Sequence, residues 1–306
     1  MNSAAPFSVA VPASSANLGP GFDAIGLALD LWLRATVGPA HAFSLAFKAG
    51  THVPTNAGFE GEILRGFDRL AGGARPPLAI VVENDIPLGK GLGASAAGAV
   101  LGLAIAAELV PQRPSEGELA RAAAELEGHP DNALPALLGG IVIAAMRDGA
   151  PPAYLRFLPP PGLRALVCVP KIVLPTAAAR ALLPASYARA DVVFNLQRAA
   201  LLAASLASGD LRVLREAAAD RIHQPYRAPL VPGFEEILAF ERPGLLATAL
   251  SGAGPSVLAL ASGEATGLGE AMREAFAREG IESDVFHLGI ATRGATVERH
   301  PSARAG

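Results

Sequence analysis

The chain has 306 residues, of which 51% are hydrophobic and 17% charged, so it can bury a large core and is long enough for about two domains. Its formal net charge of −3 provides no basic surface of the kind that nucleic acids or acidic membranes require, which favours small-molecule partners. The single cysteine, Cys168, excludes an internal disulfide framework. Because it lies in an apolar run with no charged neighbour, we expect a buried structural thiol in a reducing compartment.

No segment has the character of a targeting or membrane-spanning sequence. The first basic residue is Arg34, so neither a signal peptide nor a transit peptide is visible. The longest apolar run, 96–107, is shorter than the roughly 20 residues that a membrane helix needs. These features predict a cytoplasmic protein with no membrane and no nucleic-acid partner.

The first half of the chain combines short strands with helices. Strand-forming residues predict strands over 7–13, 27–37, 42–49, 77–85 and 141–146. Helices are expected over 94–109, 115–126 and 132–138. Ser115 followed by Glu118 has the spacing of a capping box, which supports the start of the second helix.

The segment 148–162 contains five prolines and marks the expected boundary between two units, 1–155 and 156–306. Beyond it, strands are expected over 163–170, 245–252 and 256–262, and helices over 176–182, 192–208, 211–218, 234–240 and 264–279. Strands and helices do not alternate regularly, so two α+β domains are favoured over a doubly wound parallel sheet. The tail after Thr292 is expected to be mobile.

The segment IPLGKGLGASAAGAV, 86–100, lies between a predicted strand and a predicted helix. Gly89, Gly91 and Gly93 allow the backbone to turn tightly and approach a ligand, and the helix that follows offers free amide hydrogens. Such an arrangement binds anions, so Lys90 and Ser95 could contact phosphate or a phosphate-bound metal. A purely structural glycine-rich turn is an equally acceptable interpretation of this loop taken alone.

Two other phosphate-binding motifs fit this loop less well. A Walker A loop requires Ser or Thr after its lysine, whereas Gly91 follows Lys90. Gly91, Gly93 and Ala96 satisfy GxGxxA, but the acidic strand end that a dinucleotide site needs about 20 residues later is replaced by a capped helix.

Two further segments concentrate polar residues. In PASSANLGPGFDAIGLAL, 12–29, Asn17 and Asp23 bracket a glycine-rich bend and could orient an amine or a hydroxyl, although each residue alone is typical of turns. In ELEGHPDNALPALLGG, 125–140, four polar residues crowd a helix start: Glu127, His129, Asp131 and Asn132. Either of the last two could instead cap that helix.

Together these three segments resemble the GHMP kinase family, whose phosphate loop is usually written PxxxGLGSSAA. Three segments extend the resemblance through the second half: LPTAAARALLP with Arg180, HQPYRAPLVPGF with Arg227, and TALSGAGPSVLAL. The family resemblance implies an N-terminal α+β domain similar to domain 2 of ribosomal protein S5 and a ferredoxin-like C-terminal domain, with ATP in the cleft between them. It allows a homodimer, although no segment identifies an interface.

The resemblance also implies the roles of individual residues. ATP would be held by Pro87, Leu88, Gly89, Lys90, Gly91, Leu92, Gly93, Ala94, Ser95 and Ala96. Mg²⁺ would be bound by Ser95 and Glu127. The amino and hydroxyl ends of the acceptor would be surrounded by Asn17, Asp23, His129, Asp131 and Asn132, and its carboxylate would be bound by Arg180 and Arg227.

The catalytic set would be Asp131, Asn132 and Asn17, with Asp131 either orienting the acceptor hydroxyl or abstracting its proton. The flanking segments point to L-homoserine as the acceptor, on the way to threonine. Ala94 replaces the first of the family's two serines, which could weaken nucleotide binding. The alternatives are a mevalonate-like or sugar acceptor and a protein that binds ATP without turnover.

Overall fold

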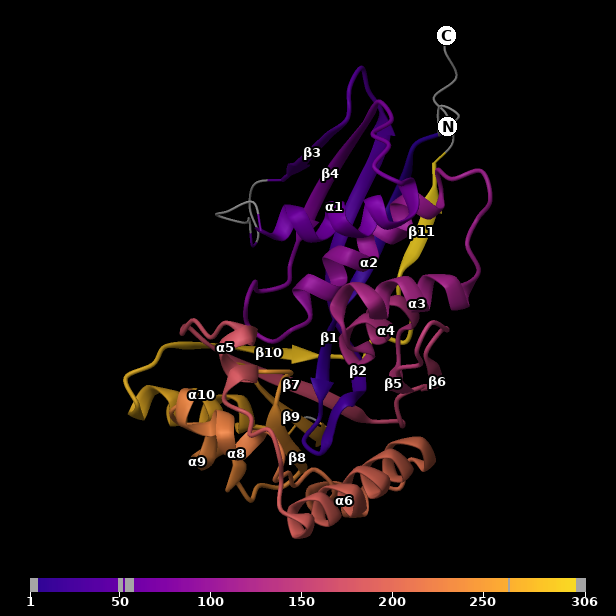
Figure 1. Cartoon of the computed structure of the whole chain (residues 1–306). Helices are drawn as coiled ribbons and strands as arrows, with labels where there is room; N and C mark the ends of the chain where they lie inside the picture. The colour runs from indigo at the N-terminus through magenta and orange to yellow at the C-terminus, as the bar shows by residue number, and fades with distance from the viewer. Residues whose placement is uncertain (1–4, 49–51, 53–57, 264, 301–306) are drawn as a thin grey trace.

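The computed structural model describes residues 5–48, 52, 58–263 and 265–300, which form two α+β units that each have their own sheet (Figure 1). The first sheet has seven strands in the described residues and the second has four. All but one of the strand pairs in the described residues are antiparallel, as expected for an α+β rather than a doubly wound protein.

The first sheet is organised around two long strands, β1 (Phe7–Asn17) and β2 (Gly21–Pro39), which pair antiparallel. β2 is long enough to pair with β5 (Ile141–Ala145) near its start and with β4 (Leu78–Asn84) near its end. The sheet is completed by β3 (Ser44–Phe47) on β4, β6 (Ala153–Phe157) on β5 and β11 (Thr296–Arg299) on β1.

Four helices pack against this sheet: α1 (Gly58–Ala71), α2 (Ala94–Ala107), α3 (Glu116–Glu127) and α4 (Pro130–Leu138), as Figure 1 shows. Every residue of α2 except Ser95 is buried, which explains why its sequence is apolar on all sides. The capping box expected at Ser115 is present, with Glu118 as its partner. α2 therefore runs through the core, with its N-terminal turn at the surface of a cavity.

The second sheet has the order β10-β7-β9-β8 and consists of β7 (Leu163–Pro170), β8 (Leu245–Leu250), β9 (Val257–Ser262) and β10 (Ser283–Leu288). Between β7 and β8 lie α5 (Thr176–Ala181), α6 (Arg189–Ser208), α7 (Leu214–Ala217), α8 (Gln224–Arg227) and α9 (Phe234–Leu238), with 3-10 turns at Leu211–Val213 and Ala228–Leu230. α10 (Leu268–Arg278) connects β9 to β10. This βαββαβ arrangement is ferredoxin-like, which confirms the expected fold of the second unit.

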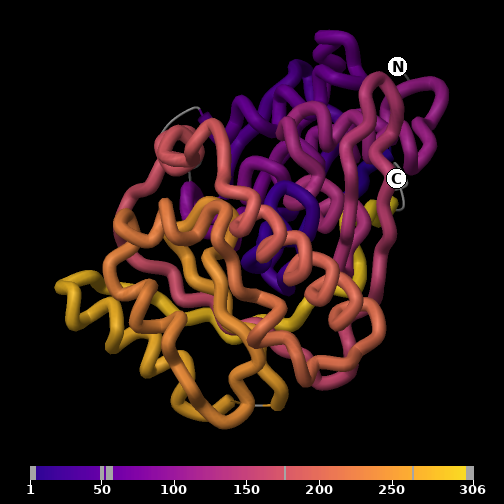
Figure 2. Tube along the Cα trace, turned by 60° about the horizontal axis from the view of Figure 1, so that its bottom comes forward, coloured from indigo at the N-terminus to yellow at the C-terminus, as the bar shows by residue number. Residues whose placement is uncertain are grey.

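The largest hydrophobic cluster of the described residues spans both units. It contains Leu27 and Leu33 from the first sheet together with Val167 and Leu258 from the second. In Figure 2 the indigo turn that joins β1 to β2 lies against the orange second unit. His223 donates a hydrogen bond from Nε2 to the carbonyl of Gly19 in that turn over 2.7 Å, so the contact is specific.

Several elements were not anticipated. No helix was expected over α1, and β10 and β11 were not expected as strands. The expectation of a mobile tail is wrong for 296–299, because these residues pair with β1 with Val297 opposite Val9. Residues 301–306 lie outside the described residues, as do residues 49 and 264 at the ends of an expected strand and helix.

The boundary at residue 155 stays a prediction. β6 extends the first sheet to Phe157, and β11 adds a strand from the far end of the chain to the same sheet.

Cys168 is buried in β7, and burial raises the pKa of its thiol to about 11, in agreement with a structural role. No helix within the described residues has the length and apolarity needed to cross a membrane.

Candidate active site

The glycine-rich loop before α2 is held between the two units. Gly91 has φ of +77°, and a side chain there would meet the carbonyl oxygen of Ser251 at 2.2 Å. Gly93 has φ of +66°, and a side chain there would meet Ser14 at 2.0 Å. Ser251 also donates its hydroxyl hydrogen to the carbonyl of Gly91 over 2.6 Å. Only glycine fits both positions, so the loop conformation follows from the sequence.

The N-terminus of α2 is open toward the cavity. Gly93 is its N-cap and provides no side-chain hydrogen bond, so the amides of the first turn stay available to a ligand. Lys90 does not add charge there, because its ammonium group donates to the carbonyls of Pro170 at 3.0 Å and Ile172 at 2.6 Å. Ala94 is buried at the position of the family's first serine.

Ser95 and Glu127 meet at the mouth of this loop. The Ser95 hydroxyl donates to Oε1 of Glu127 over 2.9 Å. The Glu127 side chain is only 10% exposed, and this burial raises the pKa of its carboxyl. Nη2 of Arg65, from α1, lies 3.6 Å from the same Oε1 and also pairs with Glu62. These groups form an oxygen-rich corner beside the open helix end.

The start of α4 places the next three polar residues. Pro130 occupies the first helical turn and His129 is the N-cap, so Asp131 and Asn132 lie inside the helix and the alternative that they cap it is wrong. Asp131 is buried, and one of its oxygens lies 2.6 Å from Nδ1 of His129. That hydrogen bond raises the pKa of His129. Asn132 accepts a hydrogen bond from Ser14 at 2.9 Å.

The turn between β1 and β2 carries Asn17 and Asp23, both with positive φ. Asn17 donates to the carbonyl of Gly252 at 2.8 Å and accepts from the backbone amide of Asp23 at 3.1 Å. The carboxylate of Asp23 forms a two-pronged ion pair with Arg180 at 2.7 and 3.0 Å. Asn17 thus joins the two units, and Asp23 and Arg180 contact each other.

Arg227 is a deeply buried cation of the site. It is 2% exposed and has no carboxylate within ion-pair distance among the described residues. Its contacts are long: Nη1 lies 3.1 Å from Nδ1 of His223 and 3.4 Å from the carbonyl of Gly252. Burial lowers the pKa of its guanidinium. The guanidinium carbons of Arg227 and Arg180 lie 5.4 and 5.5 Å from the ring centroid of Phe22.

These residues line one cavity of about 150 Å³ between the two units. Its walls include Asn17, Asp23, Glu127, His129, Asp131, Asn132, Arg180 and Arg227. From the predicted phosphate loop it includes Gly89, Lys90, Gly91, Gly93, Ala94 and Ser95, whereas Pro87, Leu88, Leu92 and Ala96 do not line it. Leu92 and Ala96 are buried in the core and support the loop from behind.

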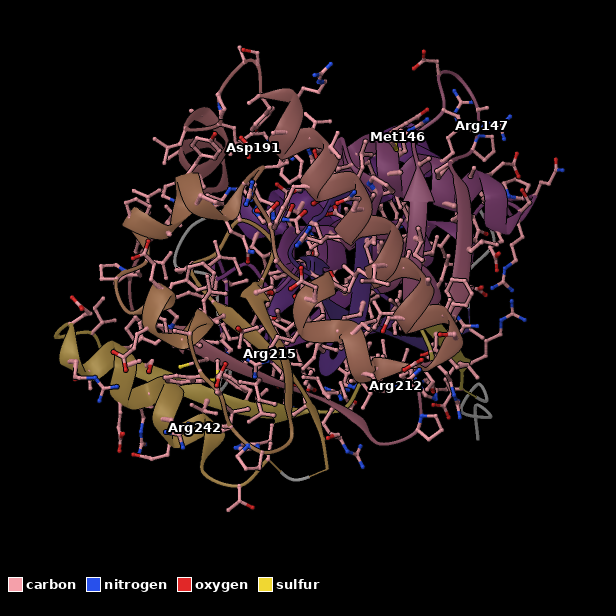
Figure 3. The ribbon with its side chains drawn as sticks, turned by 90° about the horizontal axis from the view of Figure 1, so that it is seen from below. Met146, Arg147, Asp191, Arg212, Arg215 and Arg242 are labelled. Atoms are coloured by element: carbon pink, nitrogen blue, oxygen red, sulfur yellow. The ribbon has the colours of Figure 1, made fainter. Side chains whose placement is uncertain are left out.

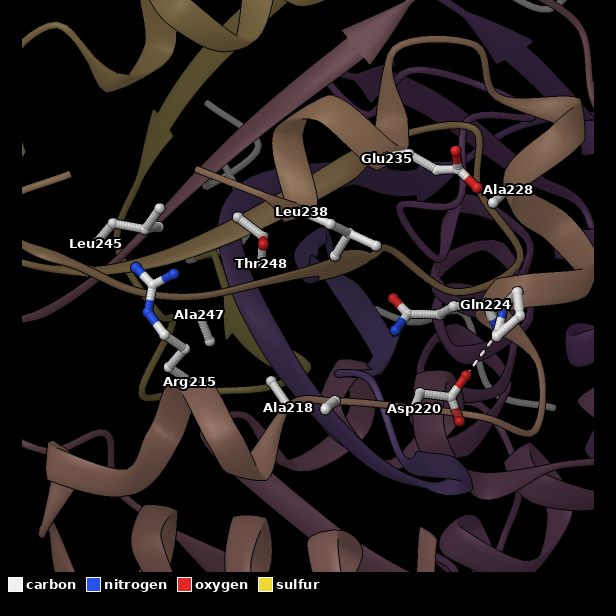
Figure 4. A pocket seen from close by; sticks show the side chains of 12 residues that line it. Arg215, Ala218, Asp220, Gln224, Ala228, Glu235, Leu238, Leu245, Ala247 and Thr248 are labelled. Carbon is white, nitrogen blue, oxygen red and sulfur yellow. Dashed lines mark hydrogen bonds between the residues drawn. The ribbon is translucent and has the colours of Figure 1, made fainter. Parts of the chain in front are cut away.

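A larger cavity of about 360 Å³ lies in the second unit, behind α8 (Figure 4). Its walls are mostly apolar, with Arg215 and Glu235 toward different sides, and Asp220 accepts a hydrogen bond from the backbone of Gln224 at 2.6 Å. None of the predicted site residues lines it. The chemistry therefore belongs to the smaller, polar cavity.

Local sequence patterns missed several residues at the site. Arg65 was not considered because no helix was expected in its segment. Ser14 contacts Asn132 within the first unit, whereas Phe22 and His223 make contacts between the two units. No local pattern distinguishes these three from ordinary strand or loop residues. The serine and glycine-rich turn after β8 was noted as part of the family resemblance, and it supports the phosphate loop and Asn17.

Comparisons with known proteins agree with this geometry. The family model described as the GHMP kinases N terminal domain matches residues 61–140, and the model described as GHMP kinases C terminal matches 202–278. The homoserine kinase of Solibacter usitatus is 43% identical over 296 residues, which cover 96% of this chain and 97% of that protein. The homoserine kinase of Moorella thermoacetica is 41% identical over 302 residues, covering 94% and 99%.

A solved structure gives the same result in three dimensions. The crystal structure of homoserine kinase from Cytophaga hutchinsonii matches with a TM-score of 0.81 and 28% identity, covering 97% of this chain and 98% of that one. The expected two-domain fold and ATP-dependent kinase class are confirmed. The chain belongs to the homoserine kinases of the GHMP kinase family.

Proposed function

We propose that this protein transfers the γ-phosphate of ATP to the side-chain hydroxyl of L-homoserine, with Mg²⁺ bound beside the phosphate loop. The product, O-phosphohomoserine, would be a step toward threonine. The observation that carries this proposal is a single cavity with an open helix N-terminus at one wall and the buried Arg227 at another. Arg227 has no carboxylate within ion-pair distance among the described residues.

The phosphate loop fits a triphosphate because its positive potential comes from the backbone. The free amides of the first turn of α2 and the N-terminal end of the helix dipole favour anions, and neither depends on Lys90. Beside Ser95 and Glu127, the guanidinium of Arg65 lies within ion-pair distance of the Glu127 carboxylate. It could neutralise part of the phosphate charge if it leaves Glu62 when ATP binds.

The donor set at Ser95 and Glu127 fits Mg²⁺. One hydroxyl and one carboxylate oxygen lie 2.9 Å apart at the helix start, and magnesium is typically held by one or two protein oxygens together with phosphates and water. When bound, the metal would neutralise charge that develops on the transferred phosphoryl group. Asp23, His129 and Asp131 also place ligand atoms within 4.8 Å of one another, but existing partners already occupy them and one atom is nitrogen.

The acceptor half of the cavity fits a small amino acid. Arg227 has guanidinium hydrogens with no partner among the described residues, so a substrate carboxylate would satisfy a buried charge. Asp23 lines the same cavity and could bind the substrate amine by giving up its pairing with Arg180, which would then join Arg227 on the substrate carboxylate. A neutral sugar offers no charged partner for either arginine.

His129 and Asp131 would position the hydroxyl and the phosphate. The hydrogen bond to Asp131 raises the pKa of His129, which favours the imidazolium form, and an imidazolium can donate a hydrogen bond to a phosphate oxygen. The second oxygen of Asp131 takes no hydrogen bond from a described residue, so it can accept one from the acceptor hydroxyl. A loose transition state requires orientation more than proton abstraction.

Two further parts of the proposal concern the cell. We place the reaction in the cytoplasm, which is supported by the single buried and unpaired thiol of Cys168. We also propose that two copies of the chain form a homodimer, as the family resemblance implies.

A coupled assay of ADP release tests the proposed reaction. With Mg²⁺ and ATP, L-homoserine should give the highest kcat/KM in a panel that includes L-serine, L-threonine and mevalonate. A preference for mevalonate would leave the kinase class intact but reject the acceptor. ATP binding without ADP release on any acceptor would establish a protein that binds ATP without turnover.

A further inference from the structure

The larger cavity of the second unit, about 360 Å³ in volume, takes no part in the proposed reaction. Its volume lies in the range of roughly 300 to 1,000 Å³ that is typical of small-molecule sites. Its walls are mostly apolar and include Leu245 and Ala247 of β8. Figure 3 views the molecule from below, where Arg215, a wall residue, lies between Arg212 and Arg242. An apolar cavity with a few polar groups is the usual form of a ligand site, so these polar groups indicate the ligand.

The side chain of Gln224 points into this cavity with an unused hydrogen-bond donor (Figure 4). Gln224 is 4% exposed, and its Oε1 accepts a hydrogen bond from the backbone amide of Leu250 over 2.8 Å. The other atom of the side-chain amide, Nε2, donates to no described residue. A buried amide donor costs free energy unless a ligand or water accepts its hydrogen. Gln224 therefore offers a donor to a ligand carbonyl.

The edge of the second sheet lies along the same cavity. β8 is the last strand in the order β10-β7-β9-β8, and Thr248 on this strand lines the cavity. Because the amide of Leu250 points away from β9 toward Gln224, alternation along the strand turns the amide and carbonyl of Thr248 in the same direction. Neither group bonds to another described residue on that side. An edge strand with free backbone groups is able to pair with a peptide unit.

Two side chains of opposite charge line the cavity from different sides, as Figure 4 shows. The guanidinium of Arg215 donates one hydrogen bond, from Nη1 to the carbonyl of Phe240 over 2.8 Å, and its other donors are free among the described residues. The carboxylate of Glu235 pairs with no described residue, whereas the adjacent Glu236 pairs with Arg278. Because the two charges lie apart, they fit a ligand whose own carboxylate and ammonium are separated by an apolar segment.

We propose that this cavity binds a dipeptide with aliphatic side chains and free termini. The peptide carboxylate binds Arg215 and the ammonium binds Glu235, while the aliphatic side chains pack against the apolar walls. The peptide group forms hydrogen bonds with Gln224 and with the edge of β8 at Thr248. A single amino acid carries its carboxylate and ammonium on one carbon atom, so it meets only one of the two charges.

The dipeptide cavity is coupled to the substrate cavity through α8, and this coupling rests on the proposed function. Gln224 begins the helix and lines the dipeptide cavity, whereas Arg227 ends it and lines the substrate cavity. One position of this short helix serves both cavities, so a ligand in either stabilises the conformation that the other ligand needs. Dipeptide binding should therefore lower the KM for homoserine, by about fivefold at saturation.

Titration of the protein alone tests the binding. L-alanyl-L-leucine should bind with a Kd below about 1 mM, and L-leucine at least about tenfold more weakly, because it lacks one charge contact and part of the apolar contact. Alanyl-leucine amide lacks the carboxylate and should bind about fivefold more weakly, as expected for one exposed ion pair. Equal affinity for leucine and the dipeptide, or no binding of about 5 mM dipeptide by calorimetry and ligand-observed NMR, would overturn the proposal.

Matched variants locate the site. Arg215→Gln should weaken binding of alanyl-leucine about fivefold but leave that of the amide unchanged, because the amide has no carboxylate. Arg212→Gln is the control, since its side chain is 87% exposed and pairs with Asp210, so both ligands should bind as they do to wild type. Glu235→Gln and its neighbour Glu236→Gln test the ammonium contact in the same way. Unchanged melting temperatures would show that the variants fold, and equal losses within either pair would reject the contact assigned to it.

A kinetic measurement tests the coupling. Saturating alanyl-leucine should lower the KM of the wild-type enzyme for homoserine about fivefold, and the same peptide concentration should lower it less in Arg215→Gln. A higher KM would place the peptide in the substrate cavity, where its carboxylate meets Arg227, and would overturn the proposal. An unchanged KM would reject the coupling through α8. If homoserine is not phosphorylated at all, the titrations still decide whether the dipeptide site exists.

Discussion

Replacing Arg227 with methionine isolates the part of substrate recognition that depends on its buried charge. Methionine has a similar length but no charge and no hydrogen-bond donor. In the free protein Arg227 is 2% exposed, and its three hydrogen bonds are between 3.1 and 3.4 Å. A substrate carboxylate would provide the charged partner that these contacts lack.

The expected effect follows from this incomplete pairing. Loss of a charge-assisted contact in a buried site costs roughly 2 to 3 kcal/mol, which corresponds to a rise of about 30- to 150-fold in the homoserine KM. The same change in Arg180 should have a smaller effect, below about tenfold, because its side chain is 46% exposed and already pairs with Asp23. The melting temperature of Arg227→Met should change little, since relief of a buried charge opposes the loss of long hydrogen bonds.

Truncation of the substrate shows whether Arg227 acts on the carboxylate. The compound 3-aminopropan-1-ol is homoserine without its carboxylate, and the wild-type enzyme should use it poorly. Arg227→Met should lose little further kcat/KM with this compound, although it loses much with homoserine. Equal losses with both acceptors would remove Arg227 from carboxylate recognition and leave it a structural role between α8 and Gly252.

Three further predictions concern the metal corner, the nucleotide and pH. Burial raises the pKa of Glu127 above its ordinary value, so its charged form lowers the stability of the folded protein at neutral pH. Glu127→Gln should therefore melt at a higher temperature than wild type at pH 7 in metal-free buffer, yet need more Mg²⁺ for activity. A lower melting temperature would indicate a structural role for Glu127. Arg65→Gln should raise the KM for ATP several-fold, because a phosphate contact is lost. Arg69 lies one turn along α1 and pairs with Glu125, so Arg69→Gln should leave the KM for ATP unchanged; equal increases in the two variants would exclude a specific contact of Arg65. Burial lowers the pKa of His223 below its ordinary 6.5, so the stability that depends on its neutral form should be lost as pH falls below about 6.5. Chemical denaturation from pH 8 to 5 should show that the free energy of unfolding declines less in His223→Gln than in wild type. An equal decline in both proteins would contradict this.

Most of the residues predicted for the site line one cavity, and they could be found because they cluster in motifs whose local structure follows from simple rules. Gly91 and Gly93 could be recognised as positions that tolerate no side chain, and Ser95 as the first polar group of a buried helix. The helix start near Asp131 could have been placed better, since Pro130 favours the first turn and makes His129 the N-cap.

The remaining features depend on contacts between distant segments, which local patterns do not encode. The ion pair of Arg180 with Asp23 joins residues 157 positions apart, and Lys90 reaches a carbonyl 80 positions away. β11 is only four residues long and is stabilised by its pairing with β1 rather than by its own composition. Arg65 was missed for a related reason. It reaches the site because α1 packs against α2, and no recognisable motif in the α1 segment indicates this contact.

The identity of the phosphorylated product tests the proposed activity most directly. Phosphorus-31 NMR of a reaction with ATP, Mg²⁺ and L-homoserine measures it without a coupling enzyme. We expect one new phosphomonoester signal, split by the two protons of the adjacent methylene group and equal in amount to the ADP formed. A signal from inorganic phosphate alone, or no loss of ATP, would contradict the transfer of phosphate from ATP to homoserine.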